Sequence, residues 1–131
     1  MQWLARLRRR LPPPIVYDPA DPSLVLLVEA FDAARADSAV LAAAAAAGVD
    51  VDRPLLVRHH LVGLDGPGAE RAAELLGQDG YALTPGGAGH LASRTQVLTA
   101  LSASQERSRM AGLAQRLGGD VAGWDALRPS E

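Results

Sequence analysis

The stretch from Leu55 to Trp124 constrains the fold most, because its apolar residues switch between strand spacing and helix spacing. The apolar segment PLLVRHHLVGL is followed by an alanine-rich helical pattern, a short strand pattern after Gly80, a polar strand pattern, a second helical pattern and GGDVAGW. This order predicts β-α-β-β-α-β, a small two-layer α+β domain with both helices on one face of an antiparallel sheet. We expect the other face of the sheet to stay open.

Side-chain alternation predicts which residues of the first strand meet the helices. The face toward the helices is expected to carry Leu55, Val57, His59 and Leu61, and the opposite face Leu56, Arg58, His60 and Val62. The helices are expected to contribute apolar stripes, Ala69, Ala72, Ala73 and Leu76 in the first and Met110, Leu113, Ala114 and Leu117 in the second. Ser102 and Gln105 have capping-box spacing at the start of the second helix.

The rest of the chain is expected to divide into an arm, a helical extension and a tail. Residues 1–22 combine an arginine cluster with several prolines, which predicts a mobile arm. Residues 23–48 predict an N-terminal helical extension, because Leu24, Leu27, Val28 and Phe31 recur at helical spacing and an alanine run follows. The α+β domain is expected at residues 49–127 and the tail at residues 128–131.

The composition does not point to a strongly charged partner, and it favours a reducing compartment. The chain has no cysteine, and its formal charge of −2 is too small to steer the whole molecule toward nucleic acid. The apolar runs are far shorter than the ~20 residues that span a bilayer. Three prolines from Pro12 follow the basic start, where a signal peptide would begin its apolar region. We therefore expect a cytoplasmic protein without a membrane span.

No group of residues in the sequence has the make-up of an active site. His59 and His60 point to opposite faces of a strand, and no cysteine is present to complete a zinc site with His90. The glycine-rich loop at residues 86–89 joins two strands and lacks the lysine of phosphate-binding loops. The few aromatic residues do not alternate along a strand as base-stacking residues do. The sequence therefore predicts no metal, no cofactor and no direct binding of nucleic acid.

Three segments, in this order and spacing, carry a family resemblance: DSAVLAAAAAAGVDVDRPLLVRHHL, AERAAELLGQDGYAL and MAGLAQRLGGDVAGW. From Asp37 to Leu127 the chain thereby resembles the family called regulator of ribonuclease activity B. The resemblance implies a ferredoxin-like fold and a protein that binds the endoribonuclease RNase E and inhibits RNA cleavage by contact. Val121 to Trp124 keeps the Gly-Trp of the family's Tyr-Asp-Gly-Trp ending but lacks its tyrosine and aspartate.

The first functional hypothesis is therefore a non-catalytic regulatory protein that binds another protein, with an endoribonuclease as the partner that the resemblance implies. The predicted partner contacts are Arg58, His60 and Arg94, and charge reversal at Arg58 or Arg94 is expected to weaken binding without unfolding the domain. The predicted structural residues are His59, Gly80, Tyr81, Gly123 and Trp124.

Two alternatives stay open on the sequence alone. One is an enzyme or small-ligand-binding protein with a pocket near His59, Tyr81 and Arg94. The other is a structural subunit that self-associates through exposed apolar residues, for which the sequence offers Val25, Leu26 and Leu56.

Overall fold

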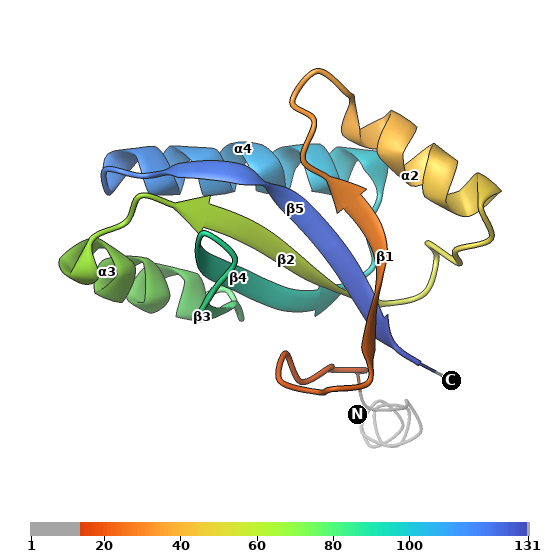
Figure 1. Ribbon diagram of the computed structural model, residues 1–131, viewed down its shortest axis with the longest axis horizontal. Helices are drawn as coiled ribbons and strands as arrows, with labels where there is room; N and C mark the ends of the chain where they lie inside the picture. Colours follow the sequence, from red (N-terminus) through yellow and green to blue (C-terminus); the bar gives the residue numbers. More distant parts are fainter. Residues whose placement is uncertain (1–13, 131) are drawn as a thin grey trace, which may run out of the picture.

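Within residues 14–130, which the computed structural model describes, three helices lie on one face of a five-stranded antiparallel sheet (Figure 1). The elements are β1 (Leu24–Ala30), α2 (Asp37–Ala46), β2 (Leu55–Val62), α3 (Gly66–Gly77), β3 (Ala82–Gly86), β4 (Gly89–Gln96), α4 (Ala100–Arg116) and β5 (Asp120–Pro129). The strands lie in the order β1-β5-β2-β4-β3. The α+β class is therefore confirmed, and the order β-α-β-β-α-β is present from β2 to β5.

Strand β1 is the main departure from the sequence prediction. Residues 24–30 form a strand that pairs with β5, so the helical extension predicted over residues 23–48 is wrong in its first part, and the helical part begins only at Asp37. A bulge between Leu26 and Val28 places Leu27 beside buried Val28 against the helices, which explains the helix-like spacing of the apolar residues. The β-branched valines and the free edge of β5 favour the strand.

Local capping residues fix where the two longer helices begin. The Asp65 carboxylate accepts a 2.7 Å hydrogen bond from the Gly68 N–H at the start of α3. At the start of α4, Thr99 and Ser102 exchange side-chain to backbone hydrogen bonds in a capping box. The predicted capping box of Ser102 and Gln105 is therefore wrong, because Ser102 is the last residue of the box and Thr99 is the first.

The core lies between the sheet and the helices, and β2 runs through its middle. The β2 side chains toward the helices are at most 1% exposed, as alternation predicts: Leu55, Val57, His59 and Leu61. Trp124 of β5 is 1% exposed and packs in the same layer. Its indole N–H donates to the Asp37 carboxylate, which also accepts from Arg107, so this buried carboxylate ties α2, α4 and β5 together.

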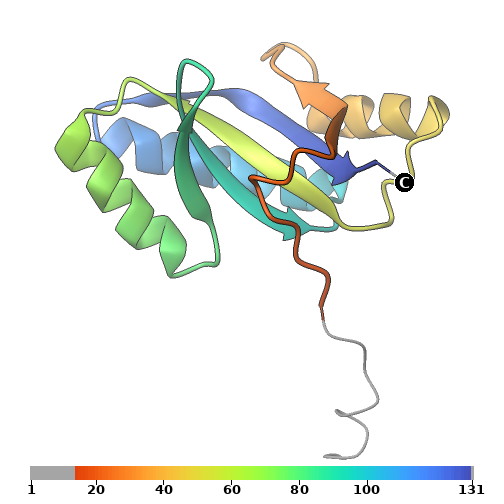
Figure 2. The ribbon, with the colours of Figure 1, turned by 60° about the horizontal axis from the view of Figure 1, so that its bottom comes forward.

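The opposite face of the sheet is covered at one end, so the expectation of an entirely open face is wrong. The backbone N–H of Tyr17 donates a 2.8 Å hydrogen bond to Thr95 Oγ1, and residues 14–22 pass beside β2 and β4 there (Figure 2). Leu56, expected to be exposed, is 1% exposed. Residues 1–13 of the expected arm lie outside the described residues.

The C-terminal strand runs further than the sequence predicts. β5 continues to Pro129, and the Arg128 guanidinium donates to the carbonyl oxygens of Asp50, Arg53 and Pro54. Arg128 therefore belongs to the folded domain and not to a tail. Residue 131 lies outside the described residues.

Candidate functional site

A cluster of charged residues lies on the sheet face away from the helices, where β2 and β5 run side by side. Alternation turns Arg58 and His60 of β2 to this face, and the register places Asp125 of β5 directly opposite Arg58. Arg58 Nε donates to Asp125 Oδ1 at 2.8 Å, and its Nη2 donates to Oδ2 at 2.7 Å. His60 Nε2 lies 2.9 Å from the same Oδ2. One carboxylate therefore holds both side chains in place.

The Asp125 carboxylate is buried although it lies on the face without helices. Its side chain is 4% exposed, whereas that of Arg58 is 25% exposed. The hydrogen bonds to Asp125 raise the pKa of the Arg58 guanidinium. Removing one partner of such a pair leaves a buried charge without its counter-ion, which costs about 3–5 kcal/mol. The expectation that charge reversal at Arg58 would leave the domain folded therefore conflicts with the structure.

His60 is held on three sides. Besides the Asp125 carboxylate, the Phe31 ring meets it edge to face, with centroids 4.8 Å apart. The β3–β4 hairpin passes close to the third side, since a Cβ added to Gly87 would lie 3.2 Å from His60 Nδ1. Gly87 has a positive φ of 56°, so it supplies both the turn and the close approach.

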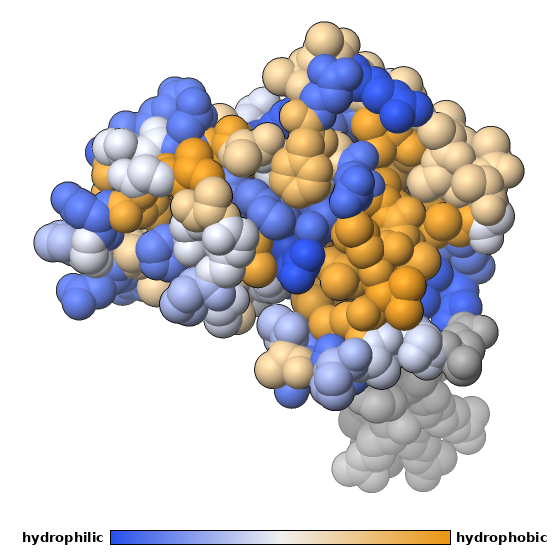
Figure 3. Space-filling model, in the orientation of Figure 1, coloured by the Kyte–Doolittle hydropathy of each residue, from blue (hydrophilic) through white to orange (hydrophobic). Residues whose placement is uncertain are grey.

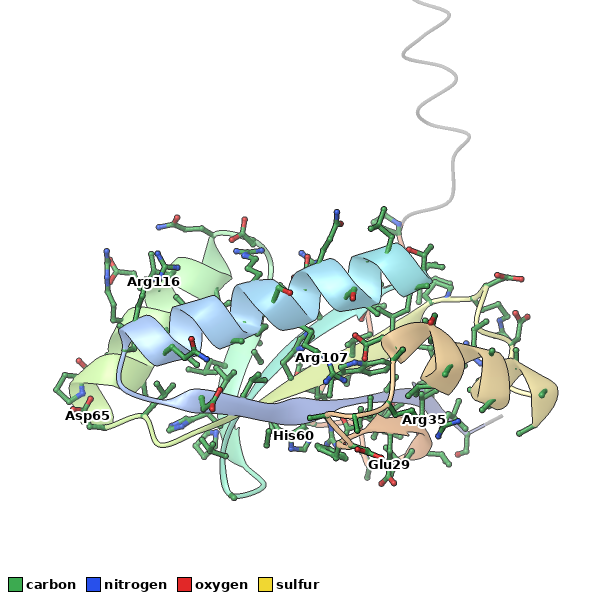
Figure 4. All side chains as sticks on the ribbon, turned by 90° about the horizontal axis from the view of Figure 1, so that it is seen from above. Glu29, Arg35, His60, Asp65, Arg107 and Arg116 are labelled. Atoms are coloured by element: carbon green, nitrogen blue, oxygen red, sulfur yellow. The ribbon has the colours of Figure 1, made fainter. Side chains whose placement is uncertain are left out.

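The cluster borders exposed residues of β1 and of the turn after it. Glu29 and His60 both lie on the side of the sheet away from α4 (Figure 4). Phe31 and Leu26 are each 43% exposed. Figure 3 shows a continuous apolar area next to hydrophilic residues where β1 and β5 run in Figure 1. We call Glu29, Phe31, Arg58, His60 and Asp125 together the β-face cluster.

Arg94, the third predicted partner contact, lies elsewhere. It pairs with Val57 across β2 and β4, which turns its side chain toward the helix layer. Its guanidinium carbon lies 4.3 Å from the centre of the Tyr81 ring, and it donates to Gln96 and to the Asp79 carbonyl. The structure therefore brings Arg58 and His60 together and separates Arg94 from them by the thickness of the sheet.

The alternative site near His59, Tyr81 and Arg94 is a packed part of the core. The His59 and Tyr81 rings lie 6.0 Å apart, and these residues are 1% and 4% exposed. Burial lowers the pKa of His59 to about 4, and burial with the hydrogen bond to Glu106 raises the pKa of the Tyr81 hydroxyl. The three residues meet as the alternative requires, but two of the three are closed to a ligand.

Comparison with known families identifies the chain. Residues 34–126 match the family RraB, described as regulator of ribonuclease activity B, which is more than half of the sequence. The chain belongs to the RraB family. Neither the curated proteins nor the solved structures gave a match.

Only part of the β-face cluster lies within the residues that match the RraB family. Arg58, His60 and Asp125 lie inside residues 34–126, whereas Glu29 and Phe31 come before them. Within the described residues of this RraB member, none of the helices is long and apolar enough to cross a membrane. The charged centre of the cluster therefore belongs to the part of the chain that the family defines, and its rim comes from β1 and the turn after it.

Within residues 14–130 the cluster does not combine its histidine with a nucleophile or with a group of metal ligands. A histidine oriented by a carboxylate activates a nucleophile in many hydrolases, but this requires a hydroxyl or thiol within reach of the ring. In residues 14–130, His60 makes no hydrogen bond to a hydroxyl, and its ring faces Phe31 and the Gly87 backbone. No group of three His, Cys, Asp or Glu residues in that range is arranged to hold a metal ion. What the cluster offers is a guanidinium and an imidazole held by one carboxylate, with an exposed aromatic ring against the imidazole.

Sequence reasoning missed Asp125, Phe31 and Glu29. Asp125 interrupts the apolar end of β5, GWDAL, and a charge within such a strand signals a buried partner on a neighbouring strand. That signal was available, although it does not name Arg58. Phe31 and Glu29 cannot be placed from the sequence, because the apolar spacing of their segment predicts a helix and not a strand.

Proposed function

We propose that this protein is a non-catalytic regulator that binds an endoribonuclease of the RNase E type and thereby lowers its cleavage of RNA. Membership of the RraB family supports a ribonuclease as the target. The observation that carries the binding site is the β-face cluster, where an arginine and an aromatic side chain stand beside an apolar area. Arginine and aromatic residues are the types that contribute most to protein interfaces.

The cluster is arranged before any partner arrives. Arg58 is held by two hydrogen bonds to Asp125, so its remaining donors point from a fixed position. A side chain that is already ordered loses less conformational entropy on binding, which saves about 0.5–1.5 kcal/mol for each long side chain. An ion pair of this kind contributes little net stability when compared with apolar residues at the same positions. The ordered position of Arg58 therefore supports a role of the pair in recognition.

The scaffold of this site is, in our proposal, a ferredoxin-like sheet with one strand added. The strand order β5-β2-β4-β3 supports the ferredoxin-like part, and β1 extends the sheet next to β5. The added strand and the turn after it bring Glu29 and Phe31 to the edge of the cluster. We propose that they adjust partner choice in this member, while Arg58 and His60 supply the common contact. The absence of cysteine suits work in the reducing cytoplasm.

A direct binding assay tests the proposal. The full chain is immobilised and titrated with a purified RNase E-type endoribonuclease from the same cell, and RNA cleavage by that enzyme is followed in parallel. We expect a complex and slower cleavage. Phe31→Ala should weaken binding about tenfold, because it removes the exposed aromatic contact of the cluster.

Charge reversal provides a matched pair of variants. Glu29→Arg changes the rim of the cluster, whereas Glu70→Arg makes the same change on an exposed turn of α3. Only the first should alter affinity and its dependence on salt. Absence of a complex at about 100 μM, where even weak partners bind, would reject the ribonuclease as partner. Equal binding by Glu29→Arg, Phe31→Ala and the unmodified chain would reject the β-face cluster as the contact.

A further inference from the structure

The two edges of the sheet differ in how they are protected from pairing with another strand. The β3 edge is short and contains Pro85 and Gly86, which are common devices against further pairing. The β1 edge has the sequence LVLLVEA, with Glu29 as its one charged residue and no proline. In residues 14–130, β1 pairs with β5 alone, so the outward backbone groups of β1 face no other strand.

Exposed apolar side chains lie along the same edge. Val25 is 45% exposed and Leu26 43% exposed, and their neighbouring positions put them on opposite faces of the strand. A bulge at Leu27 bends β1 but adds no charge to the edge. An edge strand that is apolar on both faces is suited to pairing with another strand.

Helix α2 continues this apolar edge into the helix layer. α2 packs on β1, and after Asp37 and Ser38 it has no polar residue. Apart from Ser38, its exposed residues are all alanine: Ala39, Ala42, Ala43, Ala45 and Ala46. A helix without a polar face is normally covered, and alanine lets a second helix approach closely. The edge is therefore apolar through both layers of the molecule.

From these observations we infer that a second copy of this chain pairs with β1 edge to edge, joining two sheets into one. An antiparallel register centred on Leu27 puts Glu29 opposite Val25 of the second copy, so like charges do not meet. The same two-fold operation brings the alanine face of α2 toward its counterpart. A closed two-fold contact uses the same surface on both copies, which fits an edge that lies within one strand and one helix.

The area of the contact at the β1 edge indicates how strongly the two copies associate. Seven residues of β1 extend about 23 Å, and a sheet with its helix layer is about 20 Å thick, which gives a contact of roughly 500 Å² per copy. A standard interface buries about 800 Å² per partner. We therefore expect a dimer that forms at micromolar concentration and dissociates on dilution.

Analytical ultracentrifugation of the full chain tests this inference between about 1 and 500 μM. The mass should rise from the 13.7 kDa of one chain toward twice that value. Leu26→Lys places a charge on the exposed edge and should weaken the dimer at least tenfold. Ala43→Glu, on the exposed face of α2, should do the same without touching β1. Ala82→Lys places the same charge on β3 at the opposite edge and should leave the dimer unchanged.

Two results would overturn the inference. One is a monomer at every concentration, which would show that the β1 edge stays unpaired. The other is a dimer that Leu26→Lys and Ala43→Glu leave intact while both variants keep the circular dichroism of the unmodified chain. In that case another surface joins the copies. The ribonuclease-binding assay is kept separate from both results by Phe31→Ala, because Phe31 follows β1 and takes no part in the proposed strand pairing.

Discussion

Acidification should destabilise this domain through His59, which is buried in the core. The residue is 1% exposed, and neither of its ring nitrogens has a hydrogen-bond partner among residues 14–130. Burial lowers its pKa from 6.5 to about 4, with smaller and opposing effects from the charges of Glu106 and Arg94. The folded domain therefore keeps His59 neutral at pH values where an unfolded chain would already protonate it.

The sign and size of the effect follow from these two pKa values. Below about pH 6.5 the unfolded chain binds a proton at His59 that the folded domain does not bind, so stability falls as the pH falls. The loss is complete only when the pH drops below the folded pKa of about 4. A pKa difference of one corresponds to about 1.4 kcal/mol, so the full loss is about 3 kcal/mol. Between pH 7 and pH 5 it is about 2 kcal/mol.

Urea unfolding at pH 7 and pH 5, followed by circular dichroism, measures this loss. His59→Leu is measured in parallel, so that the difference between the two chains isolates the contribution of His59 from the rest of the pH dependence. The variant should lose about 2 kcal/mol less than the unmodified chain on acidification. At pH 7 it should be no less stable, because leucine removes two unsatisfied nitrogens from the core. Equal losses in both chains would refute the assignment of a neutral, desolvated His59.

Further substitutions test the packing and the backbone. Trp124→Ala should cost about 3–5 kcal/mol in urea unfolding, through the lost apolar volume and the lost hydrogen bond to Asp37. Arg58→Leu should lower the free energy of unfolding by about 3 kcal/mol, and the double variant Arg58→Leu with Asp125→Leu should recover most of that loss. An Arg58→Leu variant as stable as the unmodified chain would contradict the buried ion pair. Gly123→Ala should destabilise by more than about 1 kcal/mol, since φ is 150° and the added Cβ would lie 2.4 Å from the Ala30 oxygen. Gly112→Ala, in open space on α4, should instead stabilise by about 0.5–1 kcal/mol, and thermal melts of the two glycine variants should shift in opposite directions.

The sequence was sufficient for the elements whose pattern is local. The alternation along β2 correctly placed His59 toward the helices and His60 away from them, because one side of β2 is lined by the core. The stripe of α4 includes Met110 and Ala114, which are fully buried as its spacing predicts. These patterns depend only on the repeat of the helix or strand that contains them.

β1 could not be recognised because its structure depends on a distant partner. A short apolar run such as LVLLVEA fits a buried helix or a strand equally well, and its bulge imitates helical spacing. The free edge of β5 decides between them, and β5 comes at the far end of the chain. The β-face cluster could not be recognised for the same reason, because Arg58 and Asp125 meet only after β2 and β5 have paired.

The pairing of β1 with β5 also affects how the protein emerges from the ribosome. Leu24 pairs with Pro129, so the first described strand to be synthesised waits for the last before it has a neighbour. Until then β1 has no strand to pair with, and the nascent chain cannot close its sheet while β5 is still in the exit tunnel. Folding of the whole five-stranded sheet is therefore completed after synthesis of β5, however early the helices form.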